Sequence, residues 1–211
     1  MNRWRVTRSI GVVLFFGYLL SGCAISSPSE ESHFYLLSSP ELNSTSCRTP
    51  GKVPDCVSEN VIITSIGPIY FADYLKRSSV VTQSTNNQYE IAKLDQWGGS
   101  LEYEFEMALL KNMMAMNPRQ RFVLDSGMLS RRSNHSLKID VYRFDARKGN
   151  FARLEAAWSW VNQSGQEVVS GTFRENVRAG SSVEEQVMAM SSLVTLFARS
   201  LSSKMYSFPG E

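Results

Sequence analysis

Two cysteines separated by eight residues, Cys47 and Cys56, have the spacing that most clearly indicates covalent chemistry. A thiol pair at this distance can close a disulfide loop, bind a metal ion or act as a redox dithiol. No histidine lies near the pair, and its spacing differs from the Cys-x-x-Cys of redox dithiols. A disulfide closing this loop would stabilise the fold by roughly 2–3 kcal/mol. The choice among the three depends on the redox compartment.

The other residues suited to catalysis do not form a pattern. His33 and His135 lie far apart in the chain, and neither has a metal-ligand spacing such as His-Glu-x-x-His. Glu102 and Glu106 share a helix face, but the start of a helix explains them better than an acid–base pair does. Residues 98–100 (Gly-Gly-Ser) could bind an anion at that helix start, yet they lack the rest of a nucleotide-binding motif. The sequence therefore predicts no enzyme, no metal site and no cofactor.

The third cysteine, Cys23, follows a different signal. Arginines at positions 3, 5 and 8 precede an apolar or small run over residues 10–20, and Ser21-Gly22 stands directly before the cysteine. This arrangement resembles the lipobox of bacterial lipoproteins, which implies cleavage before Cys23 and acylation of its thiol and amine. The alternatives are an ordinary signal peptide with a cysteine nearby, or a short membrane anchor. The apolar run is too short for an anchor, because a spanning helix needs about 20 residues.

These signals divide the chain into three parts: a signal peptide over residues 1–22, an acylated tether over 23–32, and a single domain over 33–211. The tether reaches about 15–18 Å as a flexible chain, so the domain would lie close to the membrane. Lipoproteins retained in the inner membrane typically carry Asp after the acylated cysteine, whereas Ala24 stands there here. We therefore expect the outer membrane and its periplasmic face, where the oxidising conditions favour a Cys47–Cys56 disulfide.

The formal charge of +2 comes from the leader. The leader holds three of the 22 basic residues and none of the 20 acidic ones, which leaves 19 basic and 20 acidic side chains in the rest of the chain. Such a balance excludes the basic surface of a nucleic-acid-binding protein. It also provides no general attraction to anionic lipid, so acyl chains alone would account for membrane attachment.

Apolar periodicity predicts an α+β fold: a mainly antiparallel or mixed sheet with two amphipathic helices packed on one face. One helix begins at the N-cap Ser100 and extends to Asn117, before Pro118. The other begins at the capping box of Ser182 and Glu185. The predicted strands are residues 33–37, 61–66 (ended by Gly67-Pro68), 80–84 paired with 88–92, 122–124, 137–141, and 154–160 paired with 168–177.

Four large side chains, Tyr70, Phe71, Tyr74 and Leu75, follow the Gly67-Pro68 break. Aromatic residues gathered at a turn are enriched at protein interfaces, so these four are the candidate partner-binding residues. The alternative is that they close the end of the sheet as core residues.

The order of these motifs resembles the PqiC (YmbA-like) family of auxiliary lipoproteins of ABC-type, MCE-protein lipid transport systems. The resemblance covers nearly the whole chain after the lipobox. It rests on five segments, namely Phe34-Tyr35-Leu36-Leu37, residues 66–75, Val80-Val81-Thr82-Gln83, Leu94-Asp95-Gln96-Trp97 with Leu101, and Trp158-Ser159-Trp160 with Gly165. It implies a non-enzymatic component that docks the periplasmic MCE protein at the outer membrane as a homo-oligomeric ring.

Two departures from the family pattern leave open which transport system is served. The family usually has a proline shortly before its Tyr-Leu pair, where Phe71-Ala72-Asp73 stands here, and the Cys47–Cys56 loop is an insertion. The rival functions are a secretion-system or envelope-assembly lipoprotein that binds only protein, and a periplasmic hydrolase. The missing catalytic triad and metal ligands argue against the hydrolase.

Overall fold

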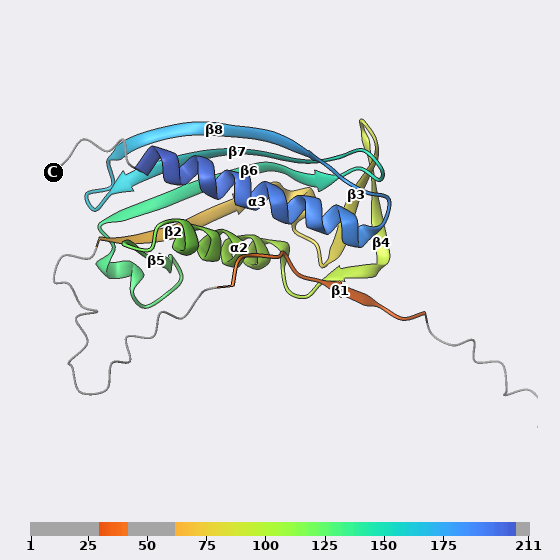
Figure 1. The fold of residues 1–211 in the computed structure, drawn as a ribbon, viewed down its shortest axis with the longest axis horizontal. Helices are drawn as coiled ribbons and strands as arrows, with labels where there is room; N and C mark the ends of the chain where they lie inside the picture. The colour runs from red at the N-terminus through yellow and green to blue at the C-terminus, as the bar shows by residue number, and fades with distance from the viewer. Residues whose placement is uncertain (1–29, 42–61, 206–211) are drawn as a thin grey trace, which may run out of the picture. The chain divides into compact units, whose positions relative to one another are not determined.

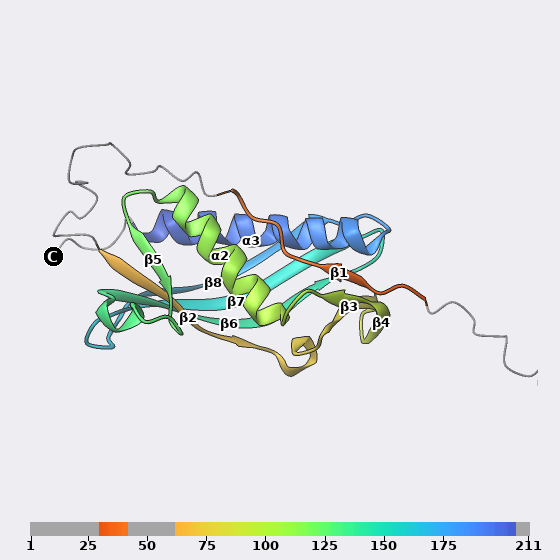
Figure 2. The ribbon, with the colours of Figure 1, turned by 90° about the horizontal axis from the view of Figure 1, so that it is seen from below.

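In the described part of the chain, an eight-stranded sheet with two helices on one face forms the fold (Figures 1 and 2). The structure is a computed structural model, and it describes residues 30–41 and 62–205 of the chain. The α+β prediction is confirmed. In chain order the elements are β1 (His33–Tyr35), β2 (Ile63–Phe71), the 3-10 helix η1 (Asp73–Leu75), β3 (Ser79–Thr85), β4 (Gln88–Trp97), α2 (Leu101–Met116), β5 (Arg121–Leu124), the 3-10 helix η2 (Ser130–Arg132), β6 (His135–Ala146), β7 (Phe151–Asn162), β8 (Glu167–Arg178) and α3 (Val183–Met205).

Strand β6 organises the sheet. On one side it pairs antiparallel with β7, and β7 pairs antiparallel with β8. On its other side the first half of β6 pairs parallel with β2, while its last residue, Ala146, pairs with Thr82 of β3. The β3–β4 hairpin and the parallel partners β1 and β5 complete the sheet. The sheet is therefore mixed, because β2 lies parallel to both of its neighbours.

Strand β2 is longer than the sequence predicts. It continues through Gly67 and Pro68 to Phe71, so the expectation that this dipeptide ends the strand is wrong. The pairing with β6 shifts register between Ile66 and Ile69, and the Gly67–Pro68 bond is cis, with a φ of 117° at Gly67. A bulge of this kind lets a strand accommodate glycine and proline without ending. The same extension carries Tyr70 and Phe71 into regular strand.

The two helices begin where their capping residues predict. The Ser100 hydroxyl accepts a hydrogen bond from the Tyr103 amide (3.2 Å) at the start of α2. At α3, the Glu185 amide donates to the Ser182 hydroxyl (3.2 Å), while a Glu185 carboxylate oxygen accepts from the Ser182 amide (2.9 Å). These contacts satisfy amide groups that the first helical turn leaves without partners. Among the described residues, neither helix is both long and apolar enough to cross a membrane.

The core lies between the helices and the sheet, and Phe105 of α2 is at its centre. Its ring packs edge-on against Phe71 of β2 and Phe144 of β6, with centroid distances of 5.3 and 5.2 Å. Phe197 of α3 lies 6.4 Å away. Edge-to-face aromatic pairs at these distances add to the stabilisation from apolar burial. One aromatic cluster therefore connects both helices to the two central strands.

Candidate partner-contact site

The four candidate contact residues separate into three environments. Tyr70 is 62% exposed on the sheet face opposite the helices, whereas Phe71 and Leu75 are buried in the core and Tyr74 is half-buried. Consecutive strand residues point to opposite faces, so the strand that buries Phe71 must expose Tyr70. Partner binding by the four residues stays a prediction, and the surface it would use is that of Tyr70.

The backbone that carries Tyr70 is held in place by the two residues that follow it. Phe71 packs against Phe105, and the Ala72 amide donates to the Val141 carbonyl (3.0 Å). Tyr70 itself lies in register with Asp140 of β6. An exposed aromatic ring on a fixed backbone loses little conformational freedom when a partner binds it.

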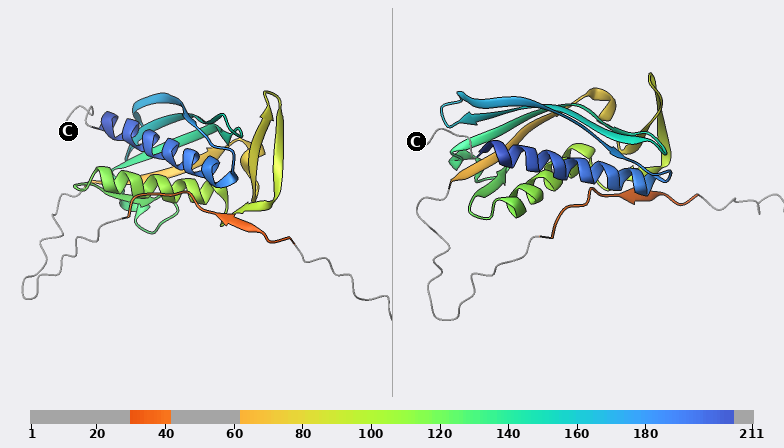
Figure 3. Two further views of the ribbon diagram at one scale, coloured as in Figure 1. Left: turned by 45° about the vertical axis from the view of Figure 1, so that its right-hand side comes forward. Right: turned by 45° about the horizontal axis from the view of Figure 1, so that its top comes forward.

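A second exposed aromatic residue, Tyr142, lies on the neighbouring strand. Burial alternates along β6, so Lys138, Asp140 and Tyr142 face outward while Leu137, Ile139 and Val141 face the core. Tyr142 is 59% exposed. Extending the predicted alternation of residues 137–141 by one position would have identified it. We call the exposed residues Tyr70, Asp140 and Tyr142 the outer tyrosine surface. The two helices lie on the other face of the sheet (Figure 3).

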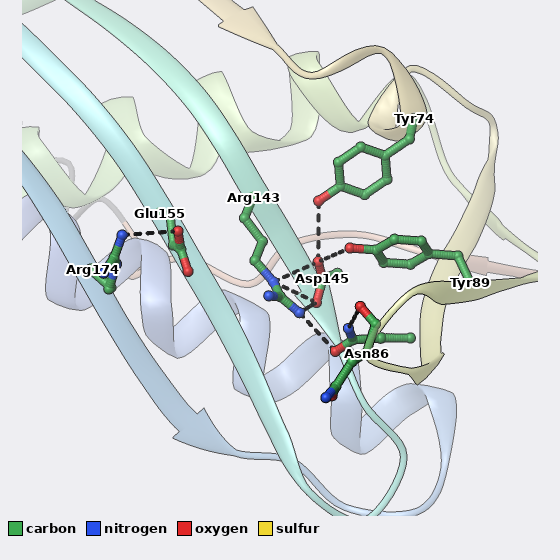
Figure 4. A network of polar contacts seen from close by, with 8 residues as sticks. Tyr74, Asn86, Tyr89, Arg143, Asp145, Glu155 and Arg174 are labelled. Carbon is green, nitrogen blue, oxygen red and sulfur yellow. Dashed lines mark hydrogen bonds and ion pairs between the residues drawn. The ribbon is translucent and has the colours of Figure 1, made fainter.

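On the same face of the sheet, farther along β6, Tyr74 takes part in a network of polar side chains (Figure 4). Its hydroxyl donates to Oδ2 of Asp145 on β6 (3.1 Å), and the Tyr89 hydroxyl from β4 donates to the same oxygen (3.2 Å). Arg143 binds the carboxylate through Nε (3.0 Å to Oδ2) and Nη2 (3.1 Å to Oδ1). The Asp145 side chain is only 1% exposed. Its charge is thus matched by a guanidinium and two hydroxyl donors, as a buried carboxylate requires.

The network continues into the hairpin. Nη2 of Arg143 donates to Oε1 of Gln83 on β3 (2.7 Å), and Nε2 of Gln83 donates to the carbonyl of Asn86 in the hairpin turn (3.2 Å). Between Val141 and Ala146, β6 leaves the pairing with β2 and reaches the pairing with β3. The side-chain contacts therefore connect η1 and the β3–β4 hairpin to β6 where backbone pairing is interrupted.

Burial and the nearby carboxylate set the protonation states in this network. Burial, followed by the charge of Asp145, raises the pKa of both Tyr74 and Tyr89 above the ordinary value of 10.0. Burial alone would lower the pKa of Arg143, but its hydrogen bond to Asp145 and the charge of that carboxylate raise it. Both tyrosines are neutral donors and the arginine is a cation at neutral pH. Both carboxylate oxygens of Asp145 already accept hydrogen bonds, so we assign the network a structural role, in which it holds η1 and the β3–β4 hairpin against β6.

The sequence pattern that defines ABC-type transport auxiliary lipoprotein components matches residues 48–202 of this chain. The chain belongs to this family. The match begins before β2 and ends within α3, so it includes Tyr70, Phe71, Tyr74 and Leu75 as well as the Asp145 network. No curated protein sequence matches the chain.

Two solved structures share the fold of this auxiliary lipoprotein. The crystal structure of an uncharacterised protein has a TM-score of 0.65 at 18% identity, covering 83% of this chain and 99% of that one. Protein XCC0632 from Xanthomonas campestris has a TM-score of 0.56 at 16% identity, covering 69% and 83% of the two chains. Identities this low show a common fold and leave function to other observations.

The remaining sequence candidates in the auxiliary lipoprotein fall into two groups. Cys23, Cys47 and Cys56 lie outside the described residues, so acylation and the disulfide stay predictions. Within the described part, no three acidic, histidine or cysteine side chains gather as a metal site, and His33 contacts Asp95 (3.2 Å) across the β1–β4 pair. Ser100 serves as the N-cap of α2.

Proposed function

We propose that this auxiliary lipoprotein is anchored in the outer membrane by acyl chains on Cys23, faces the periplasm, and docks the MCE protein of a lipid transporter without catalysing a reaction. The family assignment supports an auxiliary role in transport. The resemblance to PqiC-like proteins supports the choice of an MCE partner and of the outer membrane. The observation that carries the docking proposal is the outer tyrosine surface, where Tyr70 is exposed on a backbone fixed by buried neighbours.

The chemistry of this surface suits a protein partner. Tyrosine supplies a large contact area and a polar hydroxyl group, which is why it is enriched at interfaces and among the residues that dominate binding energy. Asp140 pairs with Tyr70 across the strands, and Lys138 and Tyr142 flank it along β6. A surface with two aromatic rings and both signs of charge favours a partner with complementary polar groups over a lipid tail.

Strand β8 supports the homo-oligomeric part of the proposal. Among the described strands it pairs only with β7, and its 12 residues leave one edge with backbone groups available for pairing. A long unpaired edge is a template for strand addition by another chain. Native mass spectrometry of the detergent-solubilised protein tests this part: a closed oligomer supports self-assembly, and a monomer at micromolar concentration contradicts it.

Partner capture tests the docking proposal. Tyr70 is replaced by a photoreactive phenylalanine analogue, the protein is cross-linked in intact cells, and the attached proteins are identified by mass spectrometry. Cross-links to an MCE protein support the proposal. Cross-links to secretion or envelope-assembly components would support the rival class of lipoprotein and overturn it. The same analogue at Arg131, an exposed position on η2, provides the background.

A further inference from the structure

A cavity of about 490 Å³ lies between the β3–β4 hairpin, the turn that joins β6 to β7, and the start of α3. On its wall, the Thr82 hydroxyl donates to the buried Gln186 amide oxygen (3.2 Å), which connects β3 to α3. The volume is in the range of small-molecule sites. Neither the family assignment nor the outer tyrosine surface accounts for this cavity.

Two adjacent cations line the cavity, Arg147 and Lys148. Within the described part of the chain, neither side chain has an ion-pair or hydrogen-bond partner. Glu90 is the one carboxylate on the described wall, and it is exposed. The wall therefore carries one more positive charge than negative charge, although the chain without its leader is close to neutral.

Backbone hydrogen bonds hold the cationic turn in place. The Arg147 amide donates to the Phe151 carbonyl (3.0 Å), and the Gly149 amide donates to the Gly180 carbonyl (2.8 Å). The Ala179 amide donates to the Asn150 carbonyl (2.9 Å), so the turn is tied to the segment that leads into α3. The two cations thus project from a fixed backbone beside the cavity instead of from an independent loop.

The start of α3 does not supply the anion site by itself. The amides of Ser181 and Ser182 already donate to a carboxylate oxygen of Glu185, at 2.8 and 2.9 Å. An incoming anion would consequently depend on Arg147 and Lys148. Charge-assisted hydrogen bonds from such cations to phosphate oxygens are among the strongest in proteins.

We propose that this cavity binds a phosphoryl group, the group shared by the headgroup of an anionic phospholipid and by free phosphate. A lipid headgroup fits the position, since β1, the β3–β4 hairpin and the start of α3 lie at the same end of the fold (Figure 1). Tyr35 of β1 is close enough to Glu184 of α3 for that carboxylate to contribute to its raised pKa, after burial and Asp95. Residue 33 is also where the chain from Cys23 joins the fold. On the cavity wall, Ile91 is 49% exposed and is available to contact an acyl chain.

The lipid assignment rests on the proposed role in lipid transport, but binding is measured on the protein alone. Full-length protein in an uncharged detergent is titrated with dihexanoyl phosphatidylglycerol, dihexanoyl phosphatidylcholine and inorganic phosphate, and Kd is measured by calorimetry. The test variant carries Arg147→Ala and Lys148→Ala. The matched control carries Arg131→Ala and Arg132→Ala, which remove an equally charged adjacent pair in η2. This pair precedes the start of β6, whereas Arg147 and Lys148 follow its end.

The wild-type protein is expected to bind phosphatidylglycerol more tightly than phosphatidylcholine. The test variant should lose about tenfold or more in affinity, and the control less than about twofold. Phosphate binding as tight as that of phosphatidylglycerol, with the same dependence on the two cations, supports the phosphoryl site and assigns it to free phosphate. No binding of either anion, or equal losses in both variants, overturns the proposal. An unchanged melting temperature and unchanged MCE cross-linking of the test variant separate this site from folding and from partner docking.

Discussion

Arg143 and Asp145, two residues apart on β6, bind each other through Nε (3.0 Å) and Nη2 (3.1 Å) of the guanidinium group. The carboxylate is 1% exposed and the arginine side chain 20% exposed. The pair lies at the interruption between the pairing of β6 with β2 and its pairing with β3. Because Tyr74 and Tyr89 donate to the same carboxylate, this ion pair connects η1 and the β3–β4 hairpin to β6.

Replacement of the buried carboxylate tests this role. Asp145→Asn leaves the Arg143 charge without its counter-ion and is expected to lower the free energy of unfolding by about 3 kcal/mol. Urea denaturation followed by circular dichroism provides the measurement. Asp73→Asn, which removes the exposed ion pair of Asp73 with Lys76, should leave the midpoint unchanged. Equal midpoints for Asp145→Asn and wild type would show that the network does not brace the hairpin.

Glu106 predicts a pH-dependent effect on stability. Burial, followed by the charge of Asp125, raises the pKa of this α2 carboxyl above its ordinary value of 4.5. The folded state therefore holds this proton more tightly than the unfolded state, and the stability from this group is complete below pH 4.5 and is lost as pH rises through the raised pKa. Glu106→Gln should raise the unfolding midpoint at pH 7, and its advantage should disappear below about pH 4.

Urea melts of this variant at several pH values, beside Glu102→Gln one turn earlier on the same helix, provide the comparison. A stabilisation by Glu106→Gln that persists undiminished at pH 3.5 would contradict the electrostatic explanation. An equal gain from Glu102→Gln at pH 7 would point to the net charge of the helix start as the cause.

Local signals predicted the helix boundaries because their causes are local. Ser100 and Ser182 cap the first turns through neighbours three residues away, and the C-cap Asn117 precedes Pro118. The end of β2 was not predictable in this way. Its continuation past Gly67 depends on the pairing of Ile69–Phe71 with β6, about 70 residues later in the chain.

The Asp145 network was invisible to sequence reasoning for the same reason. Tyr74 and Tyr89 are 71 and 56 residues away from Asp145 along the chain. Residues two apart on a strand share a face, so the spacing Arg143-x-Asp145 is equally compatible with two charges that face solvent. The bulge between Val141 and Arg143 and the arrival of the hairpin are what bury the carboxylate. Such a site depends on tertiary structure, and no local motif encodes it.

The disulfide remains to be measured. Cys47 and Cys56 are expected to be linked, because the proposed compartment is oxidising and Cys23 is expected to carry acyl chains. The protein is extracted from cell envelopes and digested without reduction. Mass spectrometry of the peptides should then detect the Cys47–Cys56 disulfide. Quantitative alkylation of both thiols before reduction would exclude the bond.

The anchor is tested by Cys23→Ser, which removes the thiol that would be acylated. The variant should keep an uncleaved leader and disappear from the outer-membrane fraction, as followed by intact mass and density-gradient fractionation. The Ala24→Asp variant serves as a matched control, because it should keep the acyl chains and move to the inner membrane. An unchanged distribution of Cys23→Ser would rule out lipid anchoring at this residue.

The affinity of the outer tyrosine surface for the MCE partner tests the central claim most directly. Tyr70→Ala should leave the free energy of unfolding within about 0.5 kcal/mol of wild type, because the side chain is 62% exposed. It should nevertheless weaken binding to the purified MCE protein about tenfold or more in surface plasmon resonance, as expected for a tyrosine at the centre of an interface. Phe71→Ala, the buried neighbour, should instead lower the free energy of unfolding by about 3–5 kcal/mol. Wild-type affinity in a fully folded Tyr70→Ala protein would contradict the account.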